Sequence, residues 1–326
     1  MPKTEEELAL EEVGKLSAET YCNIAESSIP KIFAKLYPRR IIAPQGYYPS
    51  KYYAATNALG VEQLTIGNCM QLSEIDKAIA VQAIICQEYK VPMYYLDRNL
   101  GEALLNSKVP QGTTVADLPK TRVSGVINLP KNFLISPEGE PIAYIAYSFV
   151  FADVISDIYA KYKIQFTGNN CILMSSAVAS GPKLMYGLSV ETHKTIKDID
   201  ENREYMLGTG ISVPILADED DNRFSAKCFN LLCNVLFLIE SRPDILQKQT
   251  LHGKGKYKKD KNKKSTDELW APRWIGYNYK SPNDGNPASP RMHWRQGHWR
   301  NQPCGGKDNP QIKRIWIDTV LICAPA

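Results

Sequence analysis

Helical spacing of apolar residues marks the N-terminal third of the chain. From Leu8 to Ile24 the apolar residues fall loosely on one helical face, and Pro30 interrupts the pattern. Ser73 and Asp76 have the spacing of a capping box, and an apolar-rich run follows them as far as Tyr89. The pattern therefore predicts helices over residues 5–28 and 73–89.

From Val123 onward the pattern changes to short runs of β-branched and aromatic residues separated by turn residues. Runs at hairpin spacing favour an antiparallel sheet. A turn is predicted at Pro137–Glu140. The predicted strands are Val123–Leu129, Asn132–Ile135, Ile142–Phe151, Tyr162–Thr167, Cys171–Val178 and Leu184–Val190.

A long apolar segment from about Arg223 to Ser241 predicts a buried helix. Its most apolar part, Cys228–Ile239, is too short to span a bilayer. The acidic cluster Asp218–Asp221 precedes it, where negative charge stabilises a helix N-terminus. The cluster could also suggest a metal site, but adjacent carboxylates do not by themselves converge on one ion, so a solvated helix start is favoured. Together these elements predict an α+β fold with N-terminal helices, a central antiparallel sheet, a long buried helix and a small basic C-terminal β module.

Composition is that of an ordinary globular protein, but charge is distributed unevenly. The chain has 326 residues, 44% of them hydrophobic, and a formal net charge of +4. Residues 247–326 hold 16 Lys and Arg against 6 Asp and Glu, while residues 1–246 hold 23 against 29. Seven lysines lie within residues 254–264, and all five tryptophans follow them. We predict a mildly acidic α+β body over 1–246, a lysine-rich flexible linker over 247–268 and a basic β module over 269–326.

The eight cysteines form no CxxC pair, and the sequence starts with an acidic segment rather than a basic and apolar leader. These features favour the reducing cytoplasm, with free thiols and no membrane partner. The sequence has no phosphate-binding loop of the GxxxxGK[ST] type, no nucleophile elbow and no HExxH motif. We therefore expect a non-enzymatic protein that needs no cofactor and no metal.

Two copies of the triplet His-Trp-Arg lie five residues apart near the C-terminus, at 293–295 and 298–300. A β-rich segment follows at 312–322, and the connection 301–311 would let the two segments pair as strands. Arginine can grip a phosphate with two hydrogen bonds, and tryptophan and histidine rings stack on unpaired bases. The pattern thus predicts a single-stranded nucleic-acid interface comprising Arg291, His293, Trp294, Arg295, His298, Trp299, Arg300, Lys313, Arg314 and Trp316.

Three other interpretations of this segment stay open. The tryptophans could instead pack the core of a small domain. His293 and His298 could act as the acid and base of a ribonuclease or toxin. A zinc site would use His293, His298, Cys304 and Cys323, although their spacing fits no common zinc module.

The segment His293–Trp299, followed by Ile315-Trp316-Ile317, resembles the C-terminal signature of the second anti-CRISPR family described against type V-A systems, a phage- and plasmid-borne family. The similarity extends upstream through Asn128-Leu129-Pro130 and the segment Glu240–Ile245. The resemblance implies a protein that lowers production of a type V effector in the bacterial cytoplasm. Such a protein would recognise the effector's nascent N-terminal peptide and cause loss of its translated mRNA, with RNA or the ribosome as a further partner. A nucleic-acid-binding protein without a connection to CRISPR is the alternative.

Overall fold

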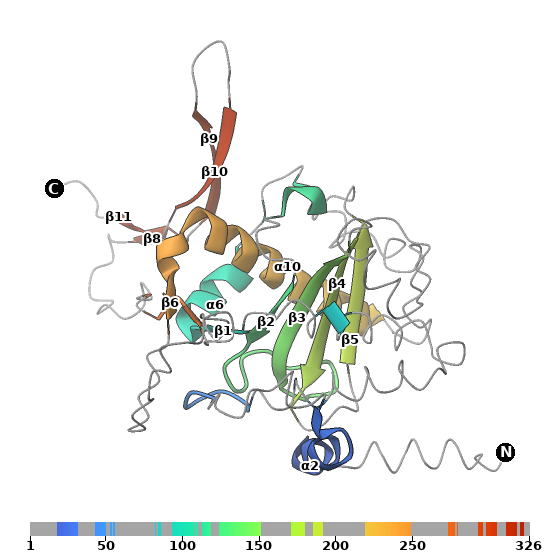
Figure 1. Ribbon diagram of the computed structural model, residues 1–326. Helices are drawn as coiled ribbons and strands as arrows, with labels where there is room; N and C mark the ends of the chain where they lie inside the picture. The colour runs from blue at the N-terminus through green and yellow to red at the C-terminus, as the bar shows by residue number, and fades with distance from the viewer. Residues whose placement is uncertain are drawn as a thin grey trace, which may run out of the picture.

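Figure 1 shows the computed structural model of the chain. The structure describes residues 18–31, 43–49, 53, 55, 82, 84, 85, 93–107, 109, 113–118, 124–150, 171–179, 185–191, 219–248, 273–277, 279, 293–295, 298–304, 311–317 and 320–322. These residues form an α+β fold, which confirms the predicted class.

A seven-stranded mixed sheet is the centre of the fold. Its strand order is β5-β4-β3-β2-β1-β7-β6. Strands β2 to β5 pair antiparallel with one another, as predicted, whereas β1 runs parallel to both β2 and β7. The strand bounds are β1 Met93–Leu96, β2 Ser124–Asn128, β3 Ile142–Val150, β4 Cys171–Val178, β5 Met185–Glu191, β6 Leu246–Lys248 and β7 Arg273–Ile275.

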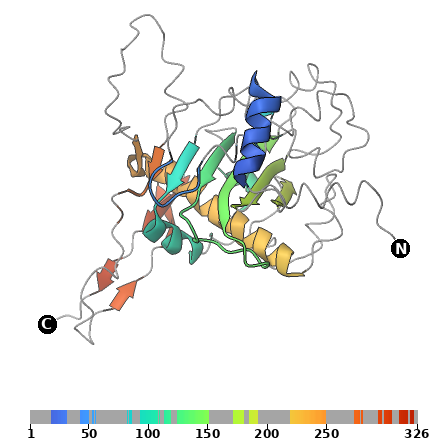
Figure 2. The same ribbon diagram turned by 90° about the horizontal axis from the view of Figure 1, so that it is seen from below.

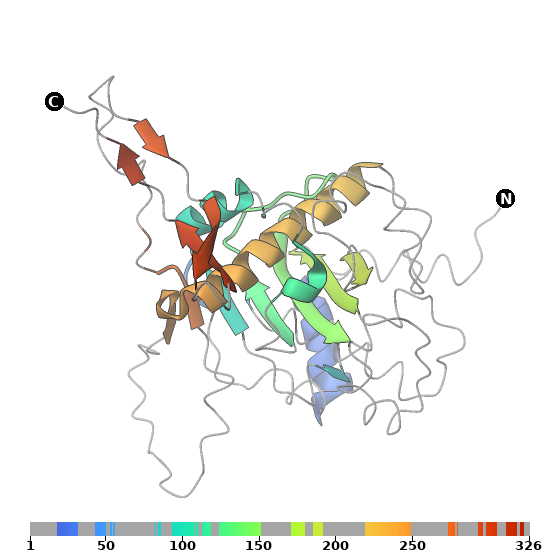
Figure 3. The same cartoon turned by 90° about the horizontal axis from the view of Figure 1, so that it is seen from above.

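Helices pack against both faces of this sheet. The long helix α10 (Glu219–Ser241) crosses one face, and α2 (Ala18–Ser28) lies against the other (Figures 2 and 3). Strand β3 supplies both cores by alternation, because Ile145 and Tyr147 belong to the α10 cluster while Tyr144 and Ala146 belong to the α2 cluster. The sheet is therefore buried on both sides over β3, where every residue is buried.

A short helix, α6 (Arg98–Leu105), follows β1 directly and packs beside α10. It starts there because Asp97 is its N-cap, with Asp97 Oδ1 accepting hydrogen bonds from the backbone N–H groups of Asn99 at 2.9 Å and Leu100 at 3.2 Å. Two single-turn 3₁₀ helices are also present, η1 (Val115–Asp117) and η2 (Pro243–Ile245).

The other predicted elements have mixed outcomes. The turn at 137–140 is confirmed, with Gly139 at φ +84° and its N–H donating to Ser136 O. The predicted strand Asn132–Ile135 is wrong: this segment is a turn, Asn132 has φ +57°, and its one bridge joins Ile135 to Pro141. A residue with positive φ cannot continue an extended ladder. The predicted strand 162–167 lies outside the described residues.

The predicted N-terminal helices are described only in part. Of residues 5–28 the structure describes the last eleven, which are helical as α2. Of the predicted helix over 73–89 it describes Gln82, Ile84 and Ile85, all three helical and buried. The described parts of both segments are therefore helical, as expected.

The predicted buried helix is confirmed as α10, which begins at Glu219, inside the acidic cluster. Exposed Asp220 and Arg223 form an ion pair of 3.7 Å in its first turn. No described group of His, Cys, Asp or Glu could hold a metal ion. By length and composition alone Arg223–Ser241 could cross a membrane, but 72% of the apolar window is buried, as in the core helix of a folded protein.

The lysine-rich segment lies between two paired strands. Residues 247 and 248, in the predicted linker, are the last residues of β6, and β7 pairs with them antiparallel, Lys248 opposite Arg273. The residues that flank the segment 249–272, Lys248 and Arg273, thus lie opposite each other at the β6 edge of the sheet. The division into body, linker and module stays a prediction, although β7 belongs by sequence to the predicted module and by topology to the central sheet.

Candidate nucleic-acid interface

The His-Trp-Arg region forms two separate strand pairs. Strand β9 (His298–Cys304) pairs antiparallel with β10 (Gln311–Ile317), and β8 (His293–Arg295) pairs with β11 (Val320–Ile322). The predicted pairing of the two segments is confirmed, but β9 runs on to Cys304, so the connection is shorter than the predicted 301–311. Figure 1 shows the β9–β10 hairpin projecting beyond α10.

Trp299 and Trp316 face each other across the β9–β10 hairpin and anchor it to the core. They occupy one register position, their ring centroids are 5.1 Å apart, and the planes meet at 66°. Trp299 also packs against Phe237 of α10, with centroids 5.7 Å apart. The side chains are only 7% and 6% exposed, so both indoles belong to the core cluster of α10. These two tryptophans are therefore core residues, but they pack in the core around α10 and not in the core of a separate small domain.

Asn234 fixes the position of Trp299. The Trp299 indole Nε1–H donates to Asn234 Oδ1 at 2.8 Å, and Asn234 Nδ2 donates to Leu104 O at 3.1 Å and Ser107 O at 3.0 Å. Two carbonyls need a donor and one indole needs an acceptor, so the orientation of the amide is determined. Asn234 is 1% exposed and joins α10, the end of α6 and β9 through one side chain.

The opposite face of the hairpin carries exposed positive charge. Successive residues of a strand point to opposite faces, so Arg300 and Lys313 lie on the face away from the Trp299–Trp316 pair. Both are exposed. Arg300 is opposite Ile315, and Lys313 is opposite Gln302, which makes the two cations diagonal neighbours, about 7–8 Å apart at Cα. Neither forms an ion pair with a described residue.

The remaining predicted residues are placed by their strand positions. His293, Trp294 and Arg295 are opposite Ile322, Leu321 and Val320. His298 is opposite Ile317, and Arg314 is opposite Asn301. Arg291 lies outside the described residues.

The strand positions bear on the two chemical alternatives for this segment. His293 and His298, the proposed acid and base, belong to different strand pairs. His298 and Cys304 stand at opposite ends of β9, about 20 Å apart at the strand rise, and cannot share one zinc ion.

Sequence reasoning missed Asn234. The signal was present, because Asn234 is a polar residue in the apolar run Cys228–Ile239, and a buried polar side chain must have partners. Its partners could not be named from the sequence, since Leu104 and Trp299 lie 130 and 65 residues away along the chain.

Comparison with known proteins identifies the family. The sequence model of the Anti-CRISPR type V subtype A2 family matches residues 94–324, most of the chain. The chain belongs to this AcrVA2-like family. The AcrVA2-like match includes both C-terminal strand pairs, and it supports an anti-CRISPR role for the chain.

The comparison with solved structures adds little to this result. The crystal structure of AcrVA2 is similar over 98% of this chain and 100% of that chain, with 12% identity. The TM-score is 0.43, which is too low to support a conclusion about this chain. No curated protein matches the sequence.

Proposed function

We propose that the chain lowers production of a type V CRISPR effector in the bacterial cytoplasm. It recognises the effector's nascent N-terminal peptide and touches the translated mRNA or the ribosome through the exposed face of the β9–β10 hairpin. Membership of the AcrVA2-like family supports the target. The observation that carries the RNA contact is the pair of exposed cations, Arg300 and Lys313, on a hairpin whose other face is anchored in the core.

The proposal of an RNA contact is supported by the arrangement of the hairpin, which is anchored by one face and exposes its cations on the other. The tryptophan pair holds the hairpin, so the cationic face needs no ordering when it meets its partner, and less affinity is lost to ordering. An arginine fork and a lysine ammonium both bind phosphate oxygens, and each contact releases counterions from the nucleic acid. Such a face binds a backbone rather than a base sequence.

The test compares single-stranded RNA binding by the wild-type chain and the double variant Arg300→Ala/Lys313→Ala. We expect about tenfold weaker binding at low salt, and a slope of log affinity against log salt that is shallower by about 1.4, the value for two lost phosphate contacts. The matched control is Arg223→Ala/Lys227→Ala, which removes two exposed cations from α10 and should leave both quantities unchanged. Equal affinity and slope for wild type and double variant would refute the RNA contact.

A second arm follows effector protein and transcript together in cells that carry a type V effector. The wild-type chain should lower both, and Arg300→Ala/Lys313→Ala should restore both. Cleavage of the RNA in the binding assay, lost in His298→Ala, would support the ribonuclease alternative instead. RNA binding with no change in effector level would support a nucleic-acid-binding protein outside CRISPR defence.

A further inference from the structure

Strands β2, β1 and β7 are parallel and finish at the same end of the sheet. Because the three strands are parallel, the residues that follow them meet at the carboxyl end of the strands. These are Lys131 beyond β2, Arg98 beyond β1 and Tyr277 beyond β7. In mixed and parallel sheets this is the end where ligands usually bind, because side chains from several loops converge there.

A row of aromatic rings leads from the core to the surface at this end. Tyr95 is fully buried, and its ring contacts those of Tyr47 at 5.2 Å and Trp274 at 5.8 Å. Tyr47 also meets Trp274 at 5.3 Å, and Trp274 meets Tyr277 at 5.5 Å. Tyr277 is 60% exposed, the highest value among the large apolar residues that the structure describes. The row therefore ends in an accessible ring on a packed base.

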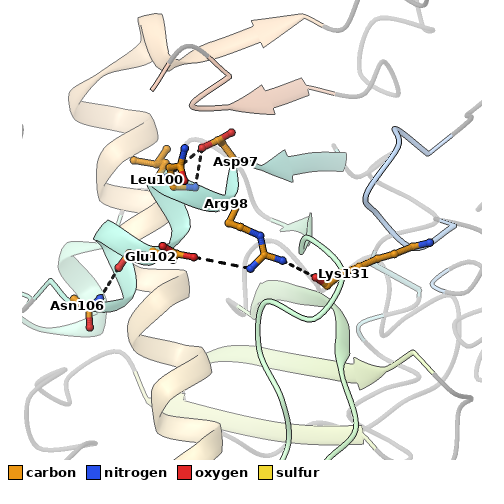
Figure 4. Close-up of polar contacts among 7 residues, drawn as sticks. Asp97, Arg98, Leu100, Glu102, Asn106 and Lys131 are labelled. Carbon is orange, nitrogen blue, oxygen red and sulfur yellow. Dashed lines mark hydrogen bonds and ion pairs between the residues drawn. The ribbon is translucent and has the colours of Figure 1, made fainter. Parts of the chain in front are cut away.

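Two exposed cations, Arg98 and Lys131, lie over two other rings, and Figure 4 shows these two side chains with their polar contacts. Lys131 Nζ is 5.6 Å from the centroid of Tyr48, and the Arg98 guanidinium is 5.9 Å from that of Phe133. Arg98 Nη2 donates to Lys131 O at 2.6 Å, while its contact with exposed Glu102 is long, at 3.9 Å. Lys131 forms no ion pair with a described residue. We call Tyr48, Trp274, Tyr277, Arg98 and Lys131 the aromatic ledge.

The backbone under the aromatic ledge is fixed. Tyr47 Oη donates to Leu96 O at 2.6 Å, and Lys131 N donates to Gly46 O at 2.8 Å, which ties the loop carrying Tyr48 to the last residue of β1 and to the loop after β2. Gly276 has φ +83°, and a Cβ there would collide with Leu100, so the turn that presents Tyr277 depends on glycine. A surface held this way loses little entropy on binding.

We propose that the aromatic ledge binds an extended peptide, packing an aromatic or methionine side chain on Tyr277 and pairing a carboxylate with Lys131 or Arg98. Tyrosine, tryptophan and arginine are the residue types that dominate binding energy at protein interfaces, and sulfur contacts with rings are favourable. The source of the peptide is the nascent effector chain, so the assignment rests on the proposed function.

Charge favours a peptide over RNA at the aromatic ledge. Glu102 lies beside Arg98. The pKa of the Tyr48 hydroxyl is raised first by its burial and second by the negative charge of Glu140. These acids would repel a phosphate backbone, but a peptide carries isolated charges that fit between them. The N-terminus of α6 offers no competing anion site, because the Asp97 carboxylate already accepts from its first-turn N–H groups.

The test uses full-length protein and overlapping 15-residue peptides that tile the N-terminal region of a type V effector, with binding followed by fluorescence anisotropy. At least one peptide should bind, and Tyr277→Ala and Lys131→Glu should each weaken it by about tenfold. Two matched controls change exposed residues elsewhere: Ile24→Ala on α2 and Lys227→Glu on α10 should stay within about twofold of wild type. Circular dichroism checks that each variant is folded.

Three results would overturn the assignment: no tiled peptide binds, the aromatic-ledge variants bind as wild type does, or Tyr277→Ala weakens binding of single-stranded RNA but of no peptide. The cellular arm separates this failure from failure of the proposed function. If the Tyr277→Ala variant lowers the effector level as strongly as wild type does, the assignment of the aromatic ledge is wrong and the proposed function stands. If peptides bind through Tyr277 but the wild-type chain leaves the effector unchanged, the function fails and the aromatic ledge stands.

Discussion

The two tryptophans of the hairpin allow one buried hydrogen bond to be measured against an internal control. Trp299 and Trp316 are equally buried and lie in ring contact with each other. They differ in hydrogen bonding: Trp299 Nε1–H donates to Asn234 Oδ1, whereas Trp316 Nε1 is buried and has no hydrogen-bond partner among the described residues. Replacing each by phenylalanine removes the same atoms, so the loss of ring area nearly cancels between the two variants.

The expected difference follows from what each substitution leaves behind. Trp299→Phe strands Asn234 Oδ1 in a side chain that is 1% exposed, and a buried polar atom without its partner costs about 1–3 kcal/mol. Trp316→Phe removes a donor that already lacks a partner, so it strands nothing and recovers part of a desolvation penalty. We expect Trp299→Phe to be more destabilising than Trp316→Phe by about 2 kcal/mol, or about 25-fold in the unfolding equilibrium constant.

Urea unfolding, followed by far-ultraviolet circular dichroism so that the signal does not depend on the indoles, gives the free energy of each variant. Asn234→Leu completes a double-mutant cycle with Trp299→Phe, and we expect a coupling energy of about 1–2 kcal/mol. Equal stabilities for the two tryptophan variants, or a coupling energy near zero, would refute the role of Asn234 as the anchor of the hairpin. In the wild-type protein, the Trp299 indole N–H should be protected from hydrogen exchange for as long as α10 stays folded.

Two further predictions concern backbone strain and charge. Gly276→Ala should destabilise the chain by more than about 2 kcal/mol in the same urea assay, because alanine is strained at φ +83° and its Cβ would collide with Leu100; Gly139→Ala, at φ +84° in open space, should cost only about 1 kcal/mol. The Arg242 side chain, by hydrogen bonding, lowers the pKa of Asp244 below its ordinary 3.8. Because the folded-state pKa is the lower one, the stabilisation is present above about pH 4 and is lost as pH falls through the folded pKa. Carboxyl titration by NMR should show Asp244 returning to its ordinary pKa in Arg242→Ala, and an unchanged titration would contradict this cause.

Strands that alternate or end in clear turns could be predicted from the sequence, and short strands buried on both faces could not. Strands β3 and β4 were found within one residue of their bounds, because long runs of β-branched and aromatic residues are flanked by turn residues. Strand β1 is Met-Tyr-Tyr-Leu, four buried residues with no alternation, and β7 has only three residues. Their parallel pairing joins Tyr94 to Arg273, and no local pattern encodes a contact over that separation.

The chemistry of the C-terminal hairpin was partly predictable for the same reason. The triplet pattern indicated a strand with tryptophan and arginine on opposite faces, and Trp299 and Arg300 follow it. The sequence could not show which face meets the body, because that depends on Asn234 and Phe237 of α10. Nor could it reveal the aromatic ledge, whose rings and cations come from four segments that are far apart along the chain.

The two surfaces make separable demands on the chain. Alternation along β9 and β10 buries the tryptophan pair and, by the same geometry, exposes Arg300 and Lys313. Replacing either cation on the exposed face should therefore leave the anchor intact. The aromatic ledge lies on different elements, at the ends of β2, β1 and β7. Substitutions at Tyr277 and at Arg300 should therefore combine additively in the free energy of unfolding, while each removes a different binding activity. If the chain lowers effector production through both contacts, as proposed, the loss of either one alone should abolish its effect on the effector.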